Sequence, residues 1–407
     1  MYADLYWSCA NQIFLSMYTS IKKPKMIGGV FCFLMLIFFC RDIASAASLT
    51  SGISRLDSLN FIYKAGENGY SCFRIPALIY TKDGTLLAFA EARKNNCGDS
   101  GDIDLVIKRS SDRGKTWSSL QVVWSDSTNT CGNPVPVQDR GTSRIWLIST
   151  WNLGTFHEKQ IISDAAKKGR HVYKLYSDDD GRSWSGPTEI TDQVKKPDWS
   201  WYATGPCHGL QITNGKYAGR LVIPINHIER GTNQNFAHII YSDDHGKSWN
   251  LGNNTPQDKM NETTVAEISK GRLMLNMRNA DRSIKTRHTA ISSNGGLSWN
   301  NVEKDTVLIE PICQGSLLSH FYNKKKPVLL FTNPANAKLR ANMTLRMSLN
   351  DGKTWKHNLV LHAGPSAYSD IALIDKTTIA SFFEAGYEKP YEGIVFKIVN
   401  YSDLIQN

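Results

Sequence analysis

Short stretches of alternating apolar and polar side chains recur along the chain. In residues 342–347, the apolar side chains Met343, Leu345 and Met347 alternate with polar ones, and a period of two is typical of a half-buried β-strand. Further apolar runs of strand-like composition occupy residues 84–93, 144–150, 219–225, 272–277 and 327–332. The pattern predicts many short strands, and only the polar segment 151–171 is expected to fold partly as a short helix.

A polar octet follows several of these runs and occurs five times. Its pattern is Ser-x-Asp/Asn-x-Gly-x-Ser/Thr-Trp, and its copies begin at Ser110, Ser177, Ser242, Ser292 and Ser348, which are 50 to 67 residues apart. The Asp or Asn side chain can accept hydrogen bonds from turn amides, and the glycine can adopt the positive φ of a hairpin turn. The closing Trp offers a large apolar body that can pack between strands. We expect each octet to fix one hairpin, a structural and not a catalytic task.

Three or four short strands per repeat predict an all-β fold, namely a six-bladed β-propeller. About 360 residues follow Leu49, which is enough for six blades of this length. Residues 393–403 lack an octet, so we expect them to complete the last blade with the strand around residues 60–66. A β-sandwich is the alternative fold. Residues 48–407 are expected to form this single domain.

The N-terminus has the features of a secretory signal peptide, which we assign to residues 1–47 with an upstream extension. A basic stretch at 22–25 precedes the apolar run Ile27–Cys40, and a small-residue cleavage signal follows at 44–46. Met17 and Met26 are alternative starts. The apolar run is shorter than the roughly 20 residues that a membrane helix needs. We therefore expect export, to the outside or to the periplasm and cell envelope, and no transmembrane span in the mature chain.

Charge and cysteine content limit the kinds of binding partner and cofactor that we expect. The formal net charge is +10 at pH 7, but Lys and Arg are dispersed and form no clustered basic patch, so no nucleic-acid partner is expected. Five cysteines remain after the leader, without metal-ligand spacing, and Cys72 and Cys97 are one pair that could be joined. No His, Asp or Glu cluster has ligand spacing either, so no metal or other cofactor is expected. We expect a monomer.

The stretch FRIPAL at residues 73–78, together with the five octets, resembles the exo-α-sialidase (neuraminidase) family of bacterial and trypanosomal type. In that family the octets are called Asp boxes and the fold is a six-bladed β-propeller. The resemblance covers essentially the whole mature chain. It implies hydrolysis of terminal α-linked sialic acids from sialylated glycans, with retention through a tyrosine-linked covalent intermediate. A trans-sialidase using the same residues, or a non-enzymatic sialic-acid-binding propeller, is the alternative.

The resemblance also implies a clamp of three arginines for the carboxylate of sialic acid. Arginine suits this task because its planar guanidinium offers paired donors and stays charged. The first falls on Arg74. The second is assigned to Arg282, 15 residues after Glu267, with Arg278 and Arg287 as rivals. The third is assigned to Arg340, with Arg346 as the weaker candidate. Glu384 matches the family's acidic residue that steadies the first arginine.

The reacting groups follow from the same resemblance. Tyr368 is the expected nucleophile, and because a phenol is a weak nucleophile near its pKa of about 10, a base must take its proton. That base is assigned to Glu267. The general acid and base is assigned to Asp99, with Asp102 and Asp104 as alternatives, and Arg93 is expected to touch the sugar at the edge of the pocket.

Two further stretches resemble the family's linings of the N-acyl and glycerol subsites, residues 133–137 and 201–212 respectively. Within the second stretch, Trp201, Tyr202 and Gln211 are candidates for stacking or hydrogen bonds to substrate, although core packing would explain the two aromatic residues equally well.

Overall fold

Antiparallel β-strands make up nearly all of the regular structure, so the fold is all-β. The computed structural model describes residues 58–163, 169–323 and 326–406, and Leu59–Asn407 form one unit. The leader assigned to residues 1–47 lies outside the described residues. Within the described part of the chain, no helix has the length and apolarity of a membrane span.

The strands follow one another in groups of four. The first group contains β2 (Cys72–Tyr80), β3 (Leu86–Arg93), β4 (Ile103–Ser110) and β5 (Gln121–Trp124). The second contains β6 (Thr130–Gln138), β7 (Ile145–Asn152), β8 (His171–Ser177) and β9 (Thr188–Glu189). The third contains β10 (Trp199–Thr204), β12 (Leu221–Glu229), β13 (Asn235–Ser242) and β14 (Asn250–Leu251), with β11 (Leu210–Gln211) paired to β12.

The second half of the chain continues the series. The fourth group contains β15 (Met260–Ile268), β16 (Arg272–Asn279), β17 (Thr286–Ser292) and β18 (Glu303–Ile309). The fifth contains β19 (Ser316–Asn323), β20 (Lys326–Pro334), β21 (Ala341–Ser348) and the first half of β22 (His357–Asp375). The sixth contains the second half of β22, β23 (Thr378–Ala385), β24 (Gly393–Asn400) and β1 (Phe61–Lys64).

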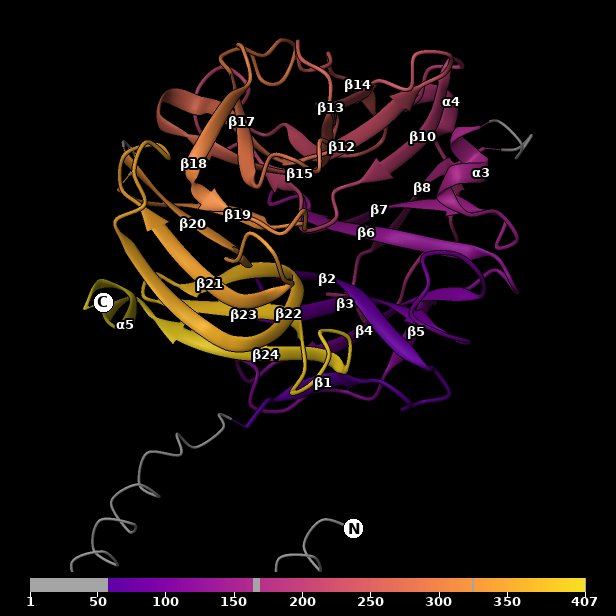
Figure 1. Cartoon of the computed structure of the whole chain (residues 1–407), viewed down its shortest axis with the longest axis horizontal. Helices are drawn as coiled ribbons and strands as arrows, with labels where there is room; N and C mark the ends of the chain where they lie inside the picture. Colours follow the sequence, from indigo (N-terminus) through magenta and orange to yellow (C-terminus); the bar gives the residue numbers. More distant parts are fainter. Residues whose placement is uncertain (1–57, 164–168, 324–325, 407) are drawn as a thin grey trace, which may run out of the picture. The chain divides into compact units, whose positions relative to one another are not determined.

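Among the described residues the helices are short. They are α3 (Glu158–Ile162), α4 (Thr191–Val194), α5 (Tyr401–Ile405) and a 3₁₀ turn at Ser269–Gly271. Figure 1 shows α3, α4 and α5 at the outside of the fold. The helix α3 confirms the helix expected within residues 151–171.

The first and last strands of the described chain pair with each other. Strand β1 lies antiparallel to β24, with Phe61 opposite Val395 and Lys64 opposite Gly393 (Figure 1). This pairing confirms that the C-terminal segment completes its group with the strand around residues 60–66. Because β1 is held by the end of the chain, neither of these two strands is left with an unpaired edge on that side.

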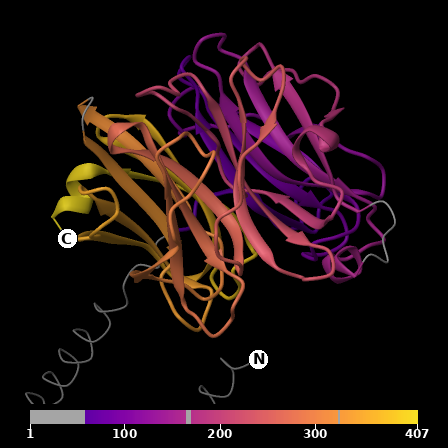
Figure 2. The same cartoon turned by 90° about the horizontal axis from the view of Figure 1, so that it is seen from above.

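The first strand of each group lies toward the centre of the arrangement. Strand β2 contacts β6, β6 contacts β10, β15 contacts β19, β19 contacts β22, and β22 contacts β2. We call these six segments the inner strands: β2, β6, β10, β15, β19 and the second half of β22. Figure 1 shows β2, β6, β15 and β19 near the middle of the fold, and Figure 2 shows the indigo-to-magenta groups beside the orange-to-yellow ones. The carboxylate of Asp370 accepts hydrogen bonds from the Leu78 amide (2.8 Å) and the Ser316 hydroxyl (2.6 Å), which joins three inner strands.

Each octet forms the turn between the third and fourth strands of a group. In the octet that begins at Ser242, the serine hydroxyl accepts a hydrogen bond from the Gly246 amide (2.8 Å), and Asp244 accepts one from the Ser248 amide (3.0 Å). Equivalent bonds to the serine, from the glycine, occur in the other four octets. The expectation that each octet fixes one hairpin is confirmed.

The octets also hold neighbouring groups together. Gly246 has a φ of +83°, and a Cβ at this position would lie 2.2 Å from the ring of Trp146 in the preceding group. Gly114 is in the same situation against Phe396, and Gly296 against Ile239. The glycine is therefore needed for a positive φ and for close approach of the next sheet. The octet tryptophan Trp117 packs edge-on against Phe396, with ring centroids 5.1 Å apart.

Candidate active site

A cavity of about 360 Å³ opens at one end of the inner strands. Five of these strands change register at that end, because each contains a bulge. The residues at the bulges that line the cavity include Ile75, Asn133, Trp201, Glu262 and Tyr368. A bulge breaks the alternation of a strand and re-aims its side chains, so these residues reach the cavity from strands whose remaining side chains are used for packing.

The centre of the cavity is a tyrosine paired with a carboxylate. The Tyr368 hydroxyl, from β22, donates a hydrogen bond of 2.5 Å to Oε1 of Glu262, from β15. Arg278, near the end of β16, donates from Nη1 to Oε2 of Glu262 (2.5 Å) and to the Tyr368 oxygen (3.0 Å). These three side chains form one hydrogen-bonded unit.

The environment keeps the Tyr368 phenol protonated at rest. Burial raises the pKa of Tyr368 well above its usual range, and the negative charge of Glu262 raises it further, while Arg278 and Arg340 act in the opposite direction. A phenol held in this way becomes a nucleophile only as its proton leaves. Glu262 Oε1 is positioned to accept that proton.

The assignment of the base to Glu267 is wrong on geometry. Glu267 lies at the opposite end of β15, five residues further along, which at about 3.3 Å per residue is roughly 16 Å from Glu262. It lines a different cavity of about 620 Å³ at the far end of the inner strands. There it accepts hydrogen bonds from the amides of Thr213 (2.7 Å) and Asn214 (2.9 Å), so it fixes that loop.

Three arginines surround Tyr368: Arg74 lies in β2, Arg278 in β16, and Arg340 directly before β21. The guanidinium carbon of Arg74 lies 5.0 Å from the ring centroid, that of Arg340 lies 5.5 Å away, and Arg278 contacts the hydroxyl. Arg340 also donates to the Tyr391 hydroxyl (2.7 Å). The choice of Arg282 as the second arginine is corrected by this placement: Arg282 is exposed in the turn after β16, on the wall of the cavity, whereas Arg278 reaches its centre.

Glu384, on β23, holds Arg74 in place. Its carboxylate accepts hydrogen bonds from Nε (3.1 Å) and Nη2 (3.3 Å) of Arg74, and from the backbone amides of Ile75 (2.9 Å) and Tyr368 (3.1 Å). Ile75 has a φ of +59°, which is a strained conformation for a β-branched residue. One fully buried carboxylate thus fixes both the first arginine and the backbone of the tyrosine.

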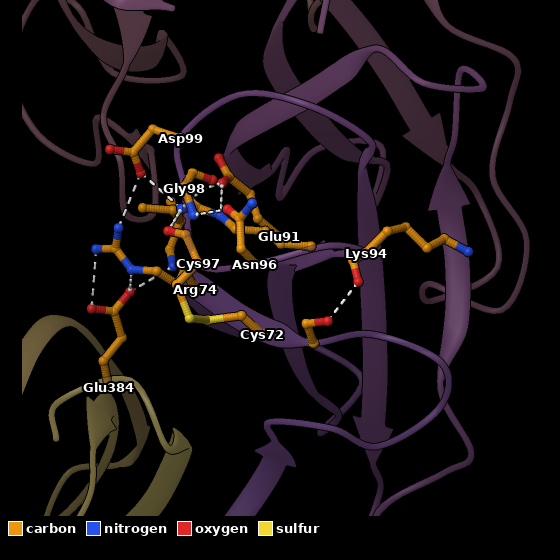
Figure 3. The surroundings of a disulfide bond; sticks show 12 residues. Cys72, Arg74, Glu91, Lys94, Asn96, Cys97, Gly98, Asp99 and Glu384 are labelled. Carbon is orange, nitrogen blue, oxygen red and sulfur yellow. Dashed lines mark hydrogen bonds and ion pairs between the residues drawn. A yellow bond between two sulfur atoms is a disulfide. The ribbon is translucent and has the colours of Figure 1, made fainter. Parts of the chain in front are cut away.

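Asp99 lies at the rim, between two arginines. Its Oδ1 is 3.0 Å from Arg74 Nη1 and 2.8 Å from Arg93 Nη1, and its side chain is 78% exposed (Figure 3). Partial burial alone would raise the pKa of Asp99, but the charges of Arg93 and Arg74 outweigh it and lower the pKa below its usual range. Cys72 and Cys97, a pair that the sequence left open, are joined by a disulfide, and this bond lies next to Asp99 (Figure 3).

One wall of the cavity carries polar groups that sequence reasoning missed. Asn226, 1% exposed, lines the cavity, and neither polar atom of its amide finds a hydrogen-bond partner among the described residues. Arg170 is buried, stacks on Trp201 at 4.2 Å and donates to Asn133 (2.7 Å). Burial lowers the pKa of Arg170 to about 10. A buried amide without a partner costs stability, so the Asn226 amide is available to a polar group that enters the cavity.

Two other expected contacts are not made here. Tyr202 is buried away from the cavity and donates its hydroxyl to the backbone oxygen of Val194 (2.8 Å), which supports the packing alternative. Gln211 lines the larger cavity and donates to Asp139 (2.8 Å). Of the three candidates in residues 201–212, only Trp201 lines the cavity that contains Tyr368.

Comparison with known proteins identifies the family. The family model described as BNR repeat-like domain matches residues 84–407. A sialidase of Bacteroides fragilis is 33% identical over 84% of this chain, and one of Micromonospora viridifaciens is 32% identical over 79%. The chain spans only 64% and 51% of the length of these two relatives. The solved structure of Hadza microbial sialidase Hz136 superposes with a TM-score of 0.77 at 31% identity, covering 84% of this chain and 68% of that one.

Proposed function

Since the chain belongs to the sialidase family, with its BNR repeats and an all-β fold of the propeller type, we propose that it is an exo-α-sialidase. Its substrates are then terminal, α-linked sialic acids of glycoproteins, glycolipids and oligosaccharides. The observation that carries the proposal is the Tyr368 hydroxyl, hydrogen-bonded to Glu262 and surrounded by Arg74, Arg278 and Arg340.

The three arginines would bind the substrate carboxylate. Sialic acid carries this carboxylate on its anomeric carbon, so the clamp that holds it also sets that carbon over Tyr368. A neutral phenol approaches a carbon beside a carboxylate without like-charge repulsion, which a carboxylate nucleophile would suffer. This is the physical reason for a tyrosine in place of the usual second carboxylate of glycosidases.

In the first step, the Tyr368 oxygen bonds to the anomeric carbon as the bond to the leaving oxygen breaks. The phenolic proton passes to Glu262 Oε1, and Asp99 donates its proton to the leaving oxygen. In the second step, Asp99 takes a proton from water, the water oxygen bonds to the anomeric carbon, and the bond to Tyr368 breaks as the phenol recovers its proton from Glu262. Two inversions give net retention.

Asp99 must be protonated to act as the acid, although its two arginines favour the ionised form in the empty site. The incoming carboxylate would replace Asp99 as the partner of Arg74. Losing an arginine and gaining a nearby negative charge both raise the pKa of a carboxyl group. Substrate binding would therefore supply the protonated acid that the first step needs.

The finer architecture and the location belong to the same proposal. Six consecutive groups of four strands, closed by β1 against β24, support a six-bladed β-propeller. Export through an N-terminal signal peptide is supported by the Cys72–Cys97 disulfide, because disulfides persist mainly in oxidising compartments.

The test is release of free sialic acid from α2,3- and α2,6-sialyllactose, with a fluorinated sialosyl probe to trap the intermediate. We expect hydrolysis of at least one isomer and a covalent adduct on the peptide that contains Tyr368. An adduct on another residue, or transfer of the sugar to added lactose in place of free sialic acid, would contradict the proposal.

A further inference from the structure

The disulfide joins the two segments that carry Arg74 and Asp99. Cys72 is the first residue of β2 and precedes Arg74 by two positions, and Cys97 precedes Asp99 by two positions. The sulfur bridge therefore ties the loop that bears Asp99 to the strand that bears Arg74, as Figure 3 shows. The carboxylate and the guanidinium meet just beyond this bridge, 3.0 Å apart.

Arg93 completes the anchor from the neighbouring strand. It is the last residue of β3 and lies directly opposite Cys72 in the β2–β3 pair. Its Nη1 donates to the backbone oxygens of Cys97 (2.6 Å) and Gly98 (2.9 Å) as well as to Asp99. Glu91 fixes the guanidinium itself, at 2.6 Å. The loop backbone thus surrounds the guanidinium group of Arg93, and the strand that carries Arg93 pairs with the strand that begins at Cys72.

The loop has little else to hold it. All of residues 94–102 are exposed or half-buried, so no apolar core fixes the segment between β3 and β4. At its far side the Gly101 amide donates to the Thr130 hydroxyl (3.1 Å), and Ser100 contacts the exposed His157 (2.6 Å). These bonds hold the far side of the loop, so close to Asp99 the segment is held by the covalent bridge and by the guanidinium groups of Arg93 and Arg74.

The other half of the site does not depend on the bridge. Tyr368, Glu262 and Arg278 come from β22, β15 and β16 and bond to one another. Arg74 is shared by both halves, but Glu384 holds it with two hydrogen bonds from a different strand. Opening the disulfide should therefore release the loop of Asp99 while the nucleophile and the arginines keep their places.

We propose that the Cys72–Cys97 disulfide is a positioning device for Asp99, so that the redox state of this bond selects which leaving groups the enzyme can expel. This inference rests on the proposed sialidase function. With the bridge closed, Asp99 protonates the leaving oxygen of a natural sialoside. With the bridge open, the acid is misplaced, and only a leaving group that departs without protonation is released efficiently.

The test compares two substrates in two redox states. kcat/KM is measured on 3′-sialyllactose and on p-nitrophenyl sialoside, for the oxidised wild-type chain, for the same chain after dithiothreitol, and for the double variant Cys72→Ser/Cys97→Ser. Since correctly placed general acids contribute about 10²- to 10⁴-fold, we expect kcat/KM on sialyllactose to fall at least tenfold and that on the aryl sialoside to fall less than twofold. kcat/KM is the readout because it reports the first, acid-dependent step.

A second readout separates positioning from folding. Water attack on the intermediate also needs Asp99, so reduced protein acting on the aryl sialoside should show a burst of p-nitrophenol and accumulate the Tyr368 adduct. The double variant also serves as a control: dithiothreitol should not change it, because Cys72–Cys97 is the one disulfide among the described residues. Circular dichroism confirms that each form is folded.

Three outcomes would overturn the inference. An equal loss of kcat/KM on both substrates would show that the disulfide stabilises the site as a whole and does not act specifically on Asp99. No loss on either substrate would show that other contacts hold Asp99. If the oxidised chain releases sialic acid from neither substrate, the proposed function itself fails, and the positioning role fails with it.

Discussion

The most informative perturbation exchanges a carboxylate for an amide at two positions of the same strand. Glu262→Gln keeps the size of the side chain that accepts the Tyr368 proton, but an amide is not a base. Removing a general base costs about 10²- to 10⁴-fold in rate, roughly 3–5 kcal/mol of transition-state stabilisation. We expect kcat/KM to fall by this factor on natural and aryl sialosides alike, because both need the nucleophile.

Glu267→Gln is the matched control, and it should lower the stability of the protein but leave its activity unchanged. Its carboxylate accepts two hydrogen bonds from Thr213 and two from Asn214, so one of its oxygens would be replaced by an NH₂ group that faces two donors. Hydrogen bonds to a charged group contribute about 1.5–3 kcal/mol each. We expect the free energy of unfolding to fall by about 3 kcal/mol or more, with kcat/KM unchanged well below the melting temperature.

The assay measures kcat/KM and urea unfolding for both variants at one temperature. The reasoning is refuted if Glu267→Gln, while folded, loses activity as strongly as Glu262→Gln. It is equally refuted if Glu262→Gln retains wild-type kcat/KM, since the short bond to Tyr368 would then have no role in catalysis.

Three further predictions concern other groups. Asp99→Ala should lower kcat/KM about 10²-fold or more on sialyllactose and far less on an aryl sialoside; equal losses would remove Asp99 from the acid role. Asn226→Leu removes a buried amide without a partner among the described residues, so steady-state kinetics should show a raised KM while thermal unfolding shows no loss of stability; a normal KM would place this wall outside the binding site. In the first octet, hydrogen bonds from Thr116 lower the pKa of Asp112 to about 2, so its contribution to stability is present above about pH 4 and lost as the pH falls toward 2. Asp112→Asn should flatten the loss of unfolding free energy over that window, and an unchanged slope would contradict the assignment.

Much of the fold could be predicted because it depends on local patterns. Alternation marked the strands, and the octets marked the hairpins, because Ser, Asp or Asn, and Gly are the residues that this turn requires. The closure of β1 against β24 followed from the one group that lacked an octet. The motif around Arg74 also located a true cavity residue, and its partner Glu384 lies where the resemblance suggested.

The errors in the site have one physical cause. Glu262 and Glu267 lie in the same strand, and nothing in its sequence says which end faces the cavity or that the register shifts between Met260 and Thr263. The same difficulty applies to Arg278 and Arg282: Arg278 lies at the end of a strand and Arg282 in the turn that follows, and the sequence does not show which of them reaches the cavity. Asn226 was overlooked, although a polar residue within the apolar run of β12 was a usable signal.

The bulges at the cavity ends of the inner strands affect how such a site can change during evolution. A side chain on a regular strand shares its orientation with every second neighbour, so moving it would also move residues of the core. At a bulge that coupling is broken. Residues such as Asn133 and Trp201 can be substituted without disturbing the packing between sheets. Insertion or deletion of one residue in a bulge would reorient them in the same way. The same fold can therefore acquire a different ligand preference through changes that are confined to the bulges.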